Sequence, residues 1–424
     1  MEHASFTNSH DLLDALALSM NIIAPVVQNH HEQTAYLSYF IANELGISYA
    51  EREKVVLAAL LHDVGVIFTE DPQTTLDFEA NAYKLAHVGA HIVSGSEGFE
   101  EVGTIIRFSQ HRWVPDRLPP AVSPTLFLYA SIVHLADRVS VCLNDRMPAL
   151  NQAEGIRILV EMGRGTEFGP QVVDAFMRVA EKPSLWMDLV YHPVPLVSLL
   201  GHPRSVSLEQ TVQLTHFMSR LIDFRSAFTA MHSAGVRASA VRLAELVGMS
   251  EEECLMMSVA GDLHDIGKIR VPREILEKPG KLTTQEFNVI QDHTYFTYQI
   301  LRPIQGFEQI AAWAAFHHER LNGRGYPFRL KAHQISLGSR IMAVADIFSA
   351  VTEVRPYRAG MEREAVERVM RDNVANGATS GVITDLLLKN YDDVNAARDQ
   401  ASREAGGRYF SAIEASEKPL ADSQ

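Results

Sequence analysis

Apolar residues along this chain recur mainly at the three- and four-residue spacing of amphipathic helices. One clear case follows Ser48 and Glu51, whose spacing is typical of a capping box and which precede an apolar run at residues 55–61. A second case follows Ser250 and Glu253, and apolar residues again continue at helical spacing. Strict alternation of apolar and polar residues, which would indicate strands, is scarce. The pattern therefore predicts an all-α protein.

The two capped helices belong to a longer internal repeat. Three pairs of residues are each 202 positions apart (250 − 48, 232 − 30 and 264 − 62): Ser48 and Ser250, His30 and His232, His62 and His264. In both halves a glycine, Gly46 or Gly248, follows the first histidine of the repeat and is suited to end a helix. We therefore expect the same helical unit to occur twice.

Helix-breaking residues set the expected domain boundaries. Prolines and a glycine cluster in the segment 191–203, so we expect a first domain over residues 1–190 and a linker over 191–204. The second domain should cover residues 205–398. Beyond it the chain turns polar without an apolar period, which predicts a fraying tail over 399–424.

Composition narrows the class of protein. Hydrophobic residues make up 46% of the 424 residues and charged residues 21%, which excludes a mostly disordered chain. The net charge of −14 argues against binding of duplex nucleic acid, so an anionic ligand would need a local cluster of cations or metal ions. Only two cysteines are present, and we find neither a secretory signal pattern nor a long unbroken apolar run. We therefore expect a cytoplasmic protein with no membrane segment.

Histidines and aspartates carry the candidate chemistry of the second repeat. The metal-capable residues are His232, His264, Asp265, His293, His317, His318 and Asp346. Imidazoles bind divalent transition-metal ions, and a carboxylate such as Asp265 can bridge two of them. Lys268 lies three residues beyond Asp265 and would place a cation beside such a pocket. Arg355 and Arg358 follow Asp346, and a glycine-rich loop with Gly323 and Gly325 follows His318.

Each of these residues taken alone has a simpler interpretation. A single histidine is more often a core or surface residue than a ligand, and single arginines are usually solvated. The aromatic residues Tyr295, Phe296 and Tyr298 fit a core or rim position better than a base-stacking platform. The ordered set of metal-capable residues at the ends of successive helical segments is what favours a metal centre.

At these residues the second half resembles the HD-GYP family of the HD phosphohydrolase superfamily. The matching stretches are Asp262–Ile269, Lys278–Thr283, His317–Pro327, Arg340–Asp346 and Arg355–Arg358, in order, within residues 221–390. The resemblance implies a helical phosphodiesterase that hydrolyses cyclic dinucleotides, chiefly cyclic di-GMP and in some members 3′3′-cGAMP. The product would be the linear dinucleotide or, after a further step, mononucleotides.

The resemblance also implies a role for each site residue. One metal ion would be held by His232, His264, Asp265 and Asp346, and a second by His293, His317 and His318, with Asp265 bridging. The two divalent ions would be iron or manganese, with nickel, cobalt or zinc as alternatives. Lys268 would act with Asp265 in catalysis by contacting the scissile phosphate. Arg355 and Arg358 would hold phosphate, while Tyr326 and Arg324 would lie beside the substrate.

Some positions depart from the family pattern. Phe228 stands where members with a third metal carry glutamate, which favours two metals here. Asn322 replaces a usual aspartate in the signature loop, Arg324 replaces a small residue, and Thr297 occupies a place often held by glycine. These changes would alter the signature loop and the local helix packing without removing a metal ligand.

The first half resembles a second, divergent HD domain. His30, His62, Asp63 and Asp137 match the minimal HD set, and His87 and His111 fall near the later histidine positions. Val66 stands where the second repeat has Lys268, and no Gly-Tyr-Pro loop follows. A regulatory or dimerising role is favoured, and a metal site with its own hydrolytic activity is the alternative.

Two other functions stay open for the whole chain. It could be a non-catalytic receptor for a cyclic dinucleotide or for a signalling partner protein, or it could act on another phosphoester. A homodimer is a further open alternative. The full ligand set of the second repeat favours the phosphodiesterase.

Overall fold

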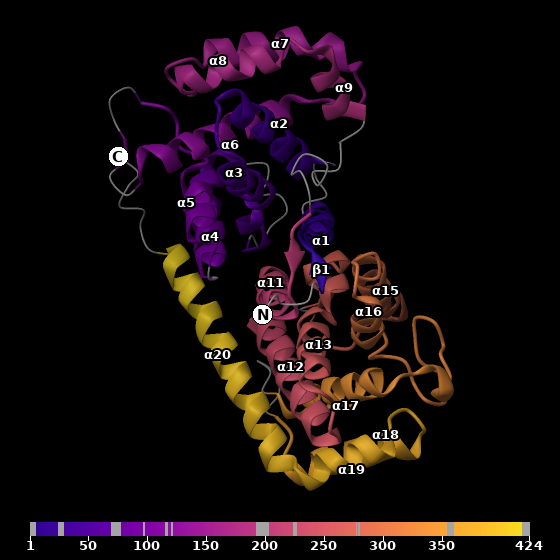
Figure 1. Cartoon of the computed structure of the whole chain (residues 1–424). Coiled ribbons are helices and arrows are strands. Elements are labelled where there is room, and N and C mark those ends of the chain that lie inside the picture. Colours follow the sequence, from indigo (N-terminus) through magenta and orange to yellow (C-terminus); the bar gives the residue numbers. More distant parts are fainter. Residues whose placement is uncertain are drawn as a thin grey trace. The chain divides into compact units, whose positions relative to one another are not determined.

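The computed structural model describes residues 6–23, 29–68, 78–95, 98–114, 118–119, 122–191, 203–223, 227–276, 278, 280–353 and 360–417. These residues are overwhelmingly helical, which confirms the predicted all-α class. They contain one pair of two-residue strands. The chain divides into two compact units, and each is described by itself (Figure 1).

The N-terminal unit spans Leu16–Pro203 together with the last residues of the chain. Its elements are the second half of α1 (Ser9–Ile23), α2 (His30–Glu44), α3 (Tyr49–Leu61), the 3-10 helix η1 (Val64–Phe68), α4 (Phe78–Ser94), α5 (Glu100–Phe108), α6 (Pro124–Cys142), α7 (Ala149–Met162), α8 (Pro170–Val179) and α9 (Pro183–Tyr191). Helix α6 packs against α2, α3 and α5 and is the core of the unit.

The C-terminal unit spans Arg204–Ser411 and also takes in the residues up to Ala15. Its elements are β1 (Thr7–Asn8), β2 (Ser205–Val206), α11 (Leu208–Asp223), α12 (Ala227–Val247), α13 (Glu251–Leu263), η3 (Ile266–Arg270), α14 (Arg273–Leu276), α15 (Thr284–Leu301), α16 (Glu308–Ala315), η4 (Ala332–Gln334), α17 (Leu337–Thr352), α18 (Arg363–Ala375), α19 (Gly381–Lys389) and α20 (Tyr391–Glu417). Helices α12, α13, α16 and α17 pack together around the candidate site.

The internal repeat appears as two matching helix pairs. Helices α2 and α3 correspond to α12 and α13, and the turn between each pair contains a glycine with positive φ, Gly46 or Gly248. In both turns the residue after the glycine bonds back to a carbonyl five residues earlier, as in a Schellman motif. The predicted helix ends at these glycines are therefore confirmed.

The two predicted capping boxes differ in detail. Ser250 and Glu253 form both reciprocal bonds at the start of α13. Ser48 accepts a bond from the Glu51 amide at the start of α3, but the Glu51 carboxylate binds Lys54 instead. The capping box is therefore complete at Ser250 and half-formed at Ser48.

Both ends of the chain differ from the predicted domain boundaries. The first residues do not belong to the N-terminal unit, because Thr7 pairs with Val206 and Asn8 with Ser205 in a two-stranded antiparallel sheet. The expected polar tail is instead part of α20, which extends to Glu417. One face of that helix is buried although its residues are mixed in polarity: Val394, Arg398, Ser402, Ala405 and Tyr409. The central part of the expected linker, residues 192–202, lies outside the described residues.

Among the described helices, α6 is long and apolar enough to cross a membrane by length and composition alone. Most of its residues are buried inside the N-terminal unit. It also carries Asp137, whose buried carboxylate contacts the ring of His30. This helix is therefore accounted for as the core of a folded domain.

Candidate metal centre

The structure brings the seven metal-capable residues of the C-terminal unit together. His232 lies on α12, His293 on α15 and Asp346 on α17. His264 and Asp265 follow the last turn of α13, and His317 and His318 follow α16. All are buried except His318, which is partly exposed. Two helix ends and three helix faces therefore converge on one small volume.

Three of these histidines are oriented in the same way. The Nδ1 atoms of His264, His293 and His317 lie 2.8, 2.5 and 2.6 Å from the carbonyl oxygen three residues earlier in the chain. A carbonyl can only accept, so each Nδ1 carries the proton and donates it. In the neutral ring, which is the form that binds a metal ion, Nε2 then presents its lone pair to the centre. This is the tautomer that a metal ion requires.

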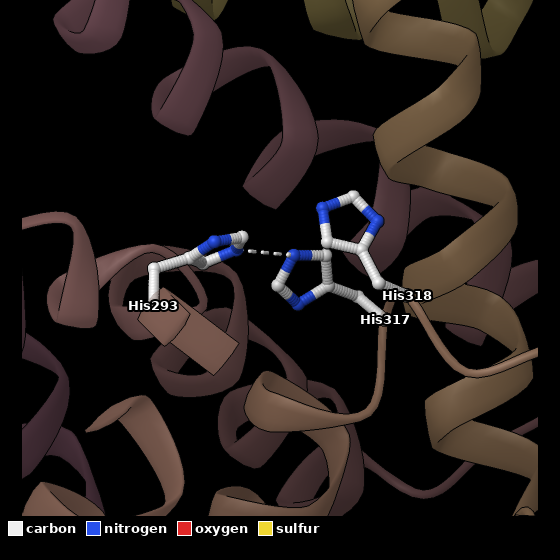
Figure 2. A group of neighbouring side chains, drawn as sticks. All are labelled: His293, His317 and His318. Atoms are coloured by element: carbon white, nitrogen blue, oxygen red, sulfur yellow. Dashed lines mark hydrogen bonds between the residues drawn. The ribbon is translucent and has the colours of Figure 1, made fainter. Parts of the chain in front are cut away.

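Potential ligand atoms form two neighbouring groups. His232, His264 and Asp346 make up one, and His293, His317 and His318 the other; within each group the ligand atoms lie within 4.8 Å of one another. Figure 2 shows the second group, in which the Nε2 atoms of His293 and His317 are 3.4 Å apart. The ring of His318 lies beside that of His317, with centroids 4.2 Å apart.

The carboxylate of Asp265 lies between the two groups. Its Oδ2 is 3.1 Å from Nε2 of His264, while its Oδ1 is 3.3 Å from Nε2 of His293 and 3.9 Å from Nε2 of His317. One oxygen therefore faces each group. A carboxylate with this orientation can bind two cations at once, one through each oxygen.

Lys268 adds a cation at the same place. Its Nζ lies 2.5 Å from Oδ2 of Asp265, one turn away along η3. Burial alone would raise the pKa of Asp265, but the neighbouring His264 and the Lys268 ammonium outweigh it and hold that pKa well below its usual range. The bridging carboxylate is therefore ionised at neutral pH.

The imidazoles of the second group are held neutral. Burial lowers the pKa of His293 to about 3 and that of His317 to about 4, and it places the pKa of His318 well below its usual value. Neutral imidazole is the form that binds metal ions. The group is therefore ready to accept a cation at neutral pH without first releasing protons.

The first group contains a residue that sequence reasoning missed. Glu353 follows the end of α17 and is buried, with Oε2 3.5 Å from Nδ1 of His232. Nε2 of His232 lies 3.1 Å from Oδ1 of Asp346. Burial opposes a charge on His232, yet Asp346 and Glu353 together raise its pKa to about 9. The available signal was spacing, because a carboxylate seven residues after Asp346 falls on the same helical face.

The signature loop is tied down by two side chains. The buried carboxylate of Glu319 accepts backbone bonds from Phe328 and Leu330 at 2.7 and 2.9 Å. Asn322 accepts a bond from the Arg324 amide and donates one to the carbonyl of Asn376. An aspartate at position 322 could make the first bond but not the second.

The loop brings one predicted substrate residue to the site. The ring of Tyr326 lies 4.9 Å from that of His318, centroid to centroid. Arg324 is exposed in the same loop. Arg355 and Arg358, the predicted phosphate-holding pair, lie outside the described residues.

The N-terminal unit repeats only the first half of this arrangement. His30, His62, Asp63 and Asp137 converge as predicted, with His30, His62 and Asp63 forming one candidate metal group. His87 and His111 lie near the positions of the later histidines but do not occupy them. The positions that match His293, His317 and His318 are held by Leu85, Ser109 and Gln110, and His111 instead packs against Phe108 and Tyr83.

The residues of the C-terminal unit fit two divalent transition-metal ions. They supply five imidazoles and two carboxylates, the donor set that first-row ions prefer. His264 Nε2 and Asp265 Oδ1 are both buried and form no hydrogen bond of their own. Buried polar atoms without a hydrogen bond are costly unless another partner, such as a cation, satisfies them.

Each of the two helical units contains a cluster of histidines and aspartates around a His-Asp dipeptide. This arrangement defines a protein built from two HD domains. Comparison with protein families agrees, since one model described as an HD domain matches residues 216–376 and another matches residues 27–142. A crystal structure of a cyclic GMP-AMP specific phosphodiesterase from Vibrio cholerae, V-cGAP3, has the same fold. Its TM-score is 0.60 at 22% sequence identity, over 93% of this chain and 98% of that one.

Sequence relatives narrow the family further. The chain is 30% identical over 381 residues to 3'3'-cGAMP-specific phosphodiesterase 1 of Vibrio cholerae, covering 85% of this chain and 87% of that protein. It is 41% identical over 150 residues to the cyclic di-GMP phosphodiesterase response regulator RpfG of Xanthomonas campestris, covering 35% of this chain and 40% of that protein. The chain belongs to the HD-GYP family of cyclic-dinucleotide phosphodiesterases.

Proposed function

We propose that the C-terminal unit hydrolyses a cyclic dinucleotide to the linear dinucleotide. The observation that carries this proposal is the position of Asp265, with one oxygen toward each histidine group and the Lys268 ammonium beside it. A carboxylate placed between two metal-binding groups can hold a pair of ions, and a pair of ions promotes in-line cleavage of a phosphodiester.

The ligand assignment follows from the two groups. His232, His264 and Asp346 would hold one ion, His293, His317 and His318 the other, and Asp265 both. When bound, the pair of ions would polarise the phosphoryl oxygens and lower the pKa of water so that a nucleophile exists near neutral pH. Iron or manganese fits this donor set, and nickel, cobalt or zinc would also fit.

The remaining residues would bind and orient the substrate. Lys268, held beside Asp265, would offset negative charge that develops on the scissile phosphate. Tyr326 and Arg324 on the signature loop would contact the nucleotide. Arg355 and Arg358 would grip phosphate oxygens and so allow a chain of net charge −14 to hold a dianionic ligand.

We favour 3′3′-cGAMP over cyclic di-GMP as the substrate. The relative that matches 85% of this chain is a 3'3'-cGAMP-specific enzyme, whereas the cyclic di-GMP enzyme RpfG matches 35% of it. A cytoplasmic location fits a substrate of this class. The N-terminal unit would then regulate or dimerise the enzyme, or would contact a signalling partner.

Product analysis with the full chain tests the proposal. Purified protein is assayed for metal content and incubated with each dinucleotide, and the products are separated by chromatography. The control is a His264→Ala/Asp265→Ala double variant with unchanged circular dichroism. We expect the wild type to yield linear product and the variant to lose both turnover and metal. Normal turnover by the variant would refute the site, and binding without product by a metal-loaded wild type would indicate a receptor.

A further inference from the structure

The candidate metal centre of the C-terminal unit is accessible from the surface at His318. The side chain of this histidine is 31% exposed, whereas the other six candidate ligands are buried. A substrate that reaches the metal ions therefore passes beside the ring of His318. The residues that surround this ring are the ones that can contact the rest of the substrate.

Two aromatic rings lead from His318 to the surface of the unit. The ring of Tyr326 is half-buried, and its centroid lies 4.9 Å from that of His318. The ring of Phe287 comes next, with its centroid 6.4 Å from that of Tyr326. Phe287 is 44% exposed, which is unusual for a phenylalanine in a folded unit.

We propose that a nucleobase of the substrate stacks on the ring of Phe287 while the scissile phosphate lies at the metal centre. This inference rests on the proposed phosphodiesterase function and adds a residue that recognises a base. Two ring contacts separate Phe287 from His318, and a sugar likewise separates a nucleobase from its phosphate. The spacing therefore suits one nucleotide.

The orientation of the two outer rings leaves room for a third ring. The planes of Phe287 and Tyr326 are 83° apart, so one ring touches the other through its edge. Such a contact covers little of the Phe287 ring, in agreement with its exposure. Every nucleobase has a flat π face, and stacking on an aromatic side chain is a common way to bind one.

The backbone that carries Phe287 is fixed before any ligand arrives. Phe287 lies in the first turn of α15, where Thr283 and Glu286 form both bonds of a capping box, at 3.2 and 2.7 Å. Nζ of Lys278 also lies 2.7 Å from both carboxylate oxygens of Glu286. A ring held in this way loses little conformational entropy when a base stacks on it.

A docking patch for another protein is the competing interpretation. Tyr295 and Phe328 are also exposed, and their ring centroids lie 6.3 Å apart. Phe328 packs on Tyr298 and Phe316, at 5.3 and 5.6 Å, whereas Phe287 packs on Tyr326, the ring beside the metal ligand His318. This contact favours a role for Phe287 in substrate binding.

Steady-state kinetics of the metal-loaded full chain with 3′3′-cGAMP test the proposal. We expect Phe287→Ala to raise KM about 5–150-fold, the loss of one stacked base, with metal content and kcat close to those of the wild type. Phe287→Leu keeps an apolar side chain but no π face and should also have a high KM, whereas Phe287→Tyr should recover a low one. Phe410→Ala, which removes an exposed phenylalanine from α20, is the matched control.

Two results would overturn the proposal. An unchanged KM in Phe287→Ala, with normal turnover by the wild type, would leave the phosphodiesterase function standing and favour the docking patch. Loss of metal or of kcat in Phe287→Ala and in Phe287→Leu would instead mean that the ring supports Tyr326 and His318 by packing.

Fluorescence provides a readout that does not depend on turnover. Phe287→Trp adds an indole to the three tryptophans of the chain, and a stacked purine quenches indole fluorescence. We expect stopped-flow mixing with 3′3′-cGAMP to quench the variant more than the wild type. Such quenching in a protein that cleaves no cyclic dinucleotide would support the stacking and refute the proposed hydrolysis. Equal signals from the variant and the wild type would overturn the stacking.

Discussion

Gly267 lies so close to His293 that a Cβ atom on the glycine would be 1.9 Å from the carbonyl oxygen of the histidine. The N-terminal unit has the same contact, with the Cβ position of Gly65 lying 2.0 Å from the carbonyl oxygen of Leu85. Each glycine lies two residues after the aspartate of the His-Asp pair. Because it has no side chain, α4 can approach η1 in the N-terminal unit and α15 can approach η3 in the C-terminal unit. In the C-terminal unit this close approach positions His293 beside Asp265.

We therefore expect Gly267→Ala to displace His293 from the second metal group. The added methyl group must push α15 away, at a cost of about 1–3 kcal/mol in the free energy of unfolding. The variant should retain less metal and should lose most of its turnover. Urea unfolding, metal analysis and the product assay measure the three effects.

Two glycine variants in the N-terminal unit serve as controls. Gly65→Ala should destabilise the chain by a similar amount but leave the metal of the C-terminal unit and its turnover unchanged. Gly155→Ala on α7 has open space around the added Cβ and should be stabilising by about 0.5–1 kcal/mol. Equal losses of turnover in Gly65→Ala and Gly267→Ala would contradict a specific role for the contact with His293.

Lys268→Ala should slow hydrolysis while leaving the metal bound. Lys268 contacts Oδ2 of Asp265 but is not among the metal ligands. Its loss should therefore remove the positive charge beside the scissile phosphate and leave the ligand set in place. By analogy with single electrostatic groups in other active sites, we expect kcat to fall about 10²–10³-fold. Arg270→Ala, an exposed cation on the same short helix, is the matched control and should retain full activity. Loss of metal from Lys268→Ala would assign the lysine a structural role instead.

Glu353 should strengthen metal binding by orienting the ring of His232. Its carboxylate faces Nδ1 of that histidine and would hold Nε2 toward the first metal, as carboxylates behind metal-bound histidines do. We expect Glu353→Ala to weaken metal binding about 10–100-fold, measured by competition with a chelator. Glu353→Gln keeps an oxygen acceptor and should recover much of the affinity. Wild-type affinity in the alanine variant would mean that Glu353 does not position His232.

His134 in α6 should make the N-terminal unit sensitive to acid. Burial lowers its pKa to about 4, whereas an unfolded chain has a histidine pKa of about 6.5. Between these values the unfolded state binds more protons, so the free energy of unfolding falls as the pH drops from about 6.5 to about 4. Above pH 7 both states are neutral and the effect vanishes.

His134→Leu isolates this contribution. Between pH 7 and pH 4.5 the wild type should lose about 2–3 kcal/mol more of its free energy of unfolding than the variant, as measured by urea unfolding at both pH values. The buried leucine keeps most of the packing volume, so the comparison at pH 7 reports the packing change alone. Parallel losses in both proteins would assign the acid sensitivity to other groups.

The sequence predicted the features that depend on local spacing. The helix pair before each HD dipeptide, the glycine that ends its first helix and the capping box of Ser250 are set by residues within one or two turns, so they could be read directly. The seven metal-capable residues of the second repeat were also identified, because each falls at the end or on the face of an apolar helix.

Features that depend on chain length between helices were not predictable in the same way. The repeat offset is 202 at His62 and His264, but it becomes 208 (293 − 85) where α4 matches α15. The offset of 202 leads from His293 to position 91 (293 − 202), whereas the matching position is held by Leu85. Glu353 and the buried face of α20 were missed for a related reason, because their partners lie more than a hundred residues away in sequence.

The pairing of β1 with β2 has a practical consequence for anyone dividing this protein. The carboxylate of Asp11 also accepts a bond from the backbone of Gln305, and Phe6 packs on Phe307, so the opening residues are part of the hydrolytic unit. A truncated protein that starts at Ser205 would lack strand β1 and the Phe6 ring, which both belong to the C-terminal unit. The N-terminal helices are an insertion within that unit, and they should be excised internally, by rejoining Ala15 to Arg204 through a short flexible bridge.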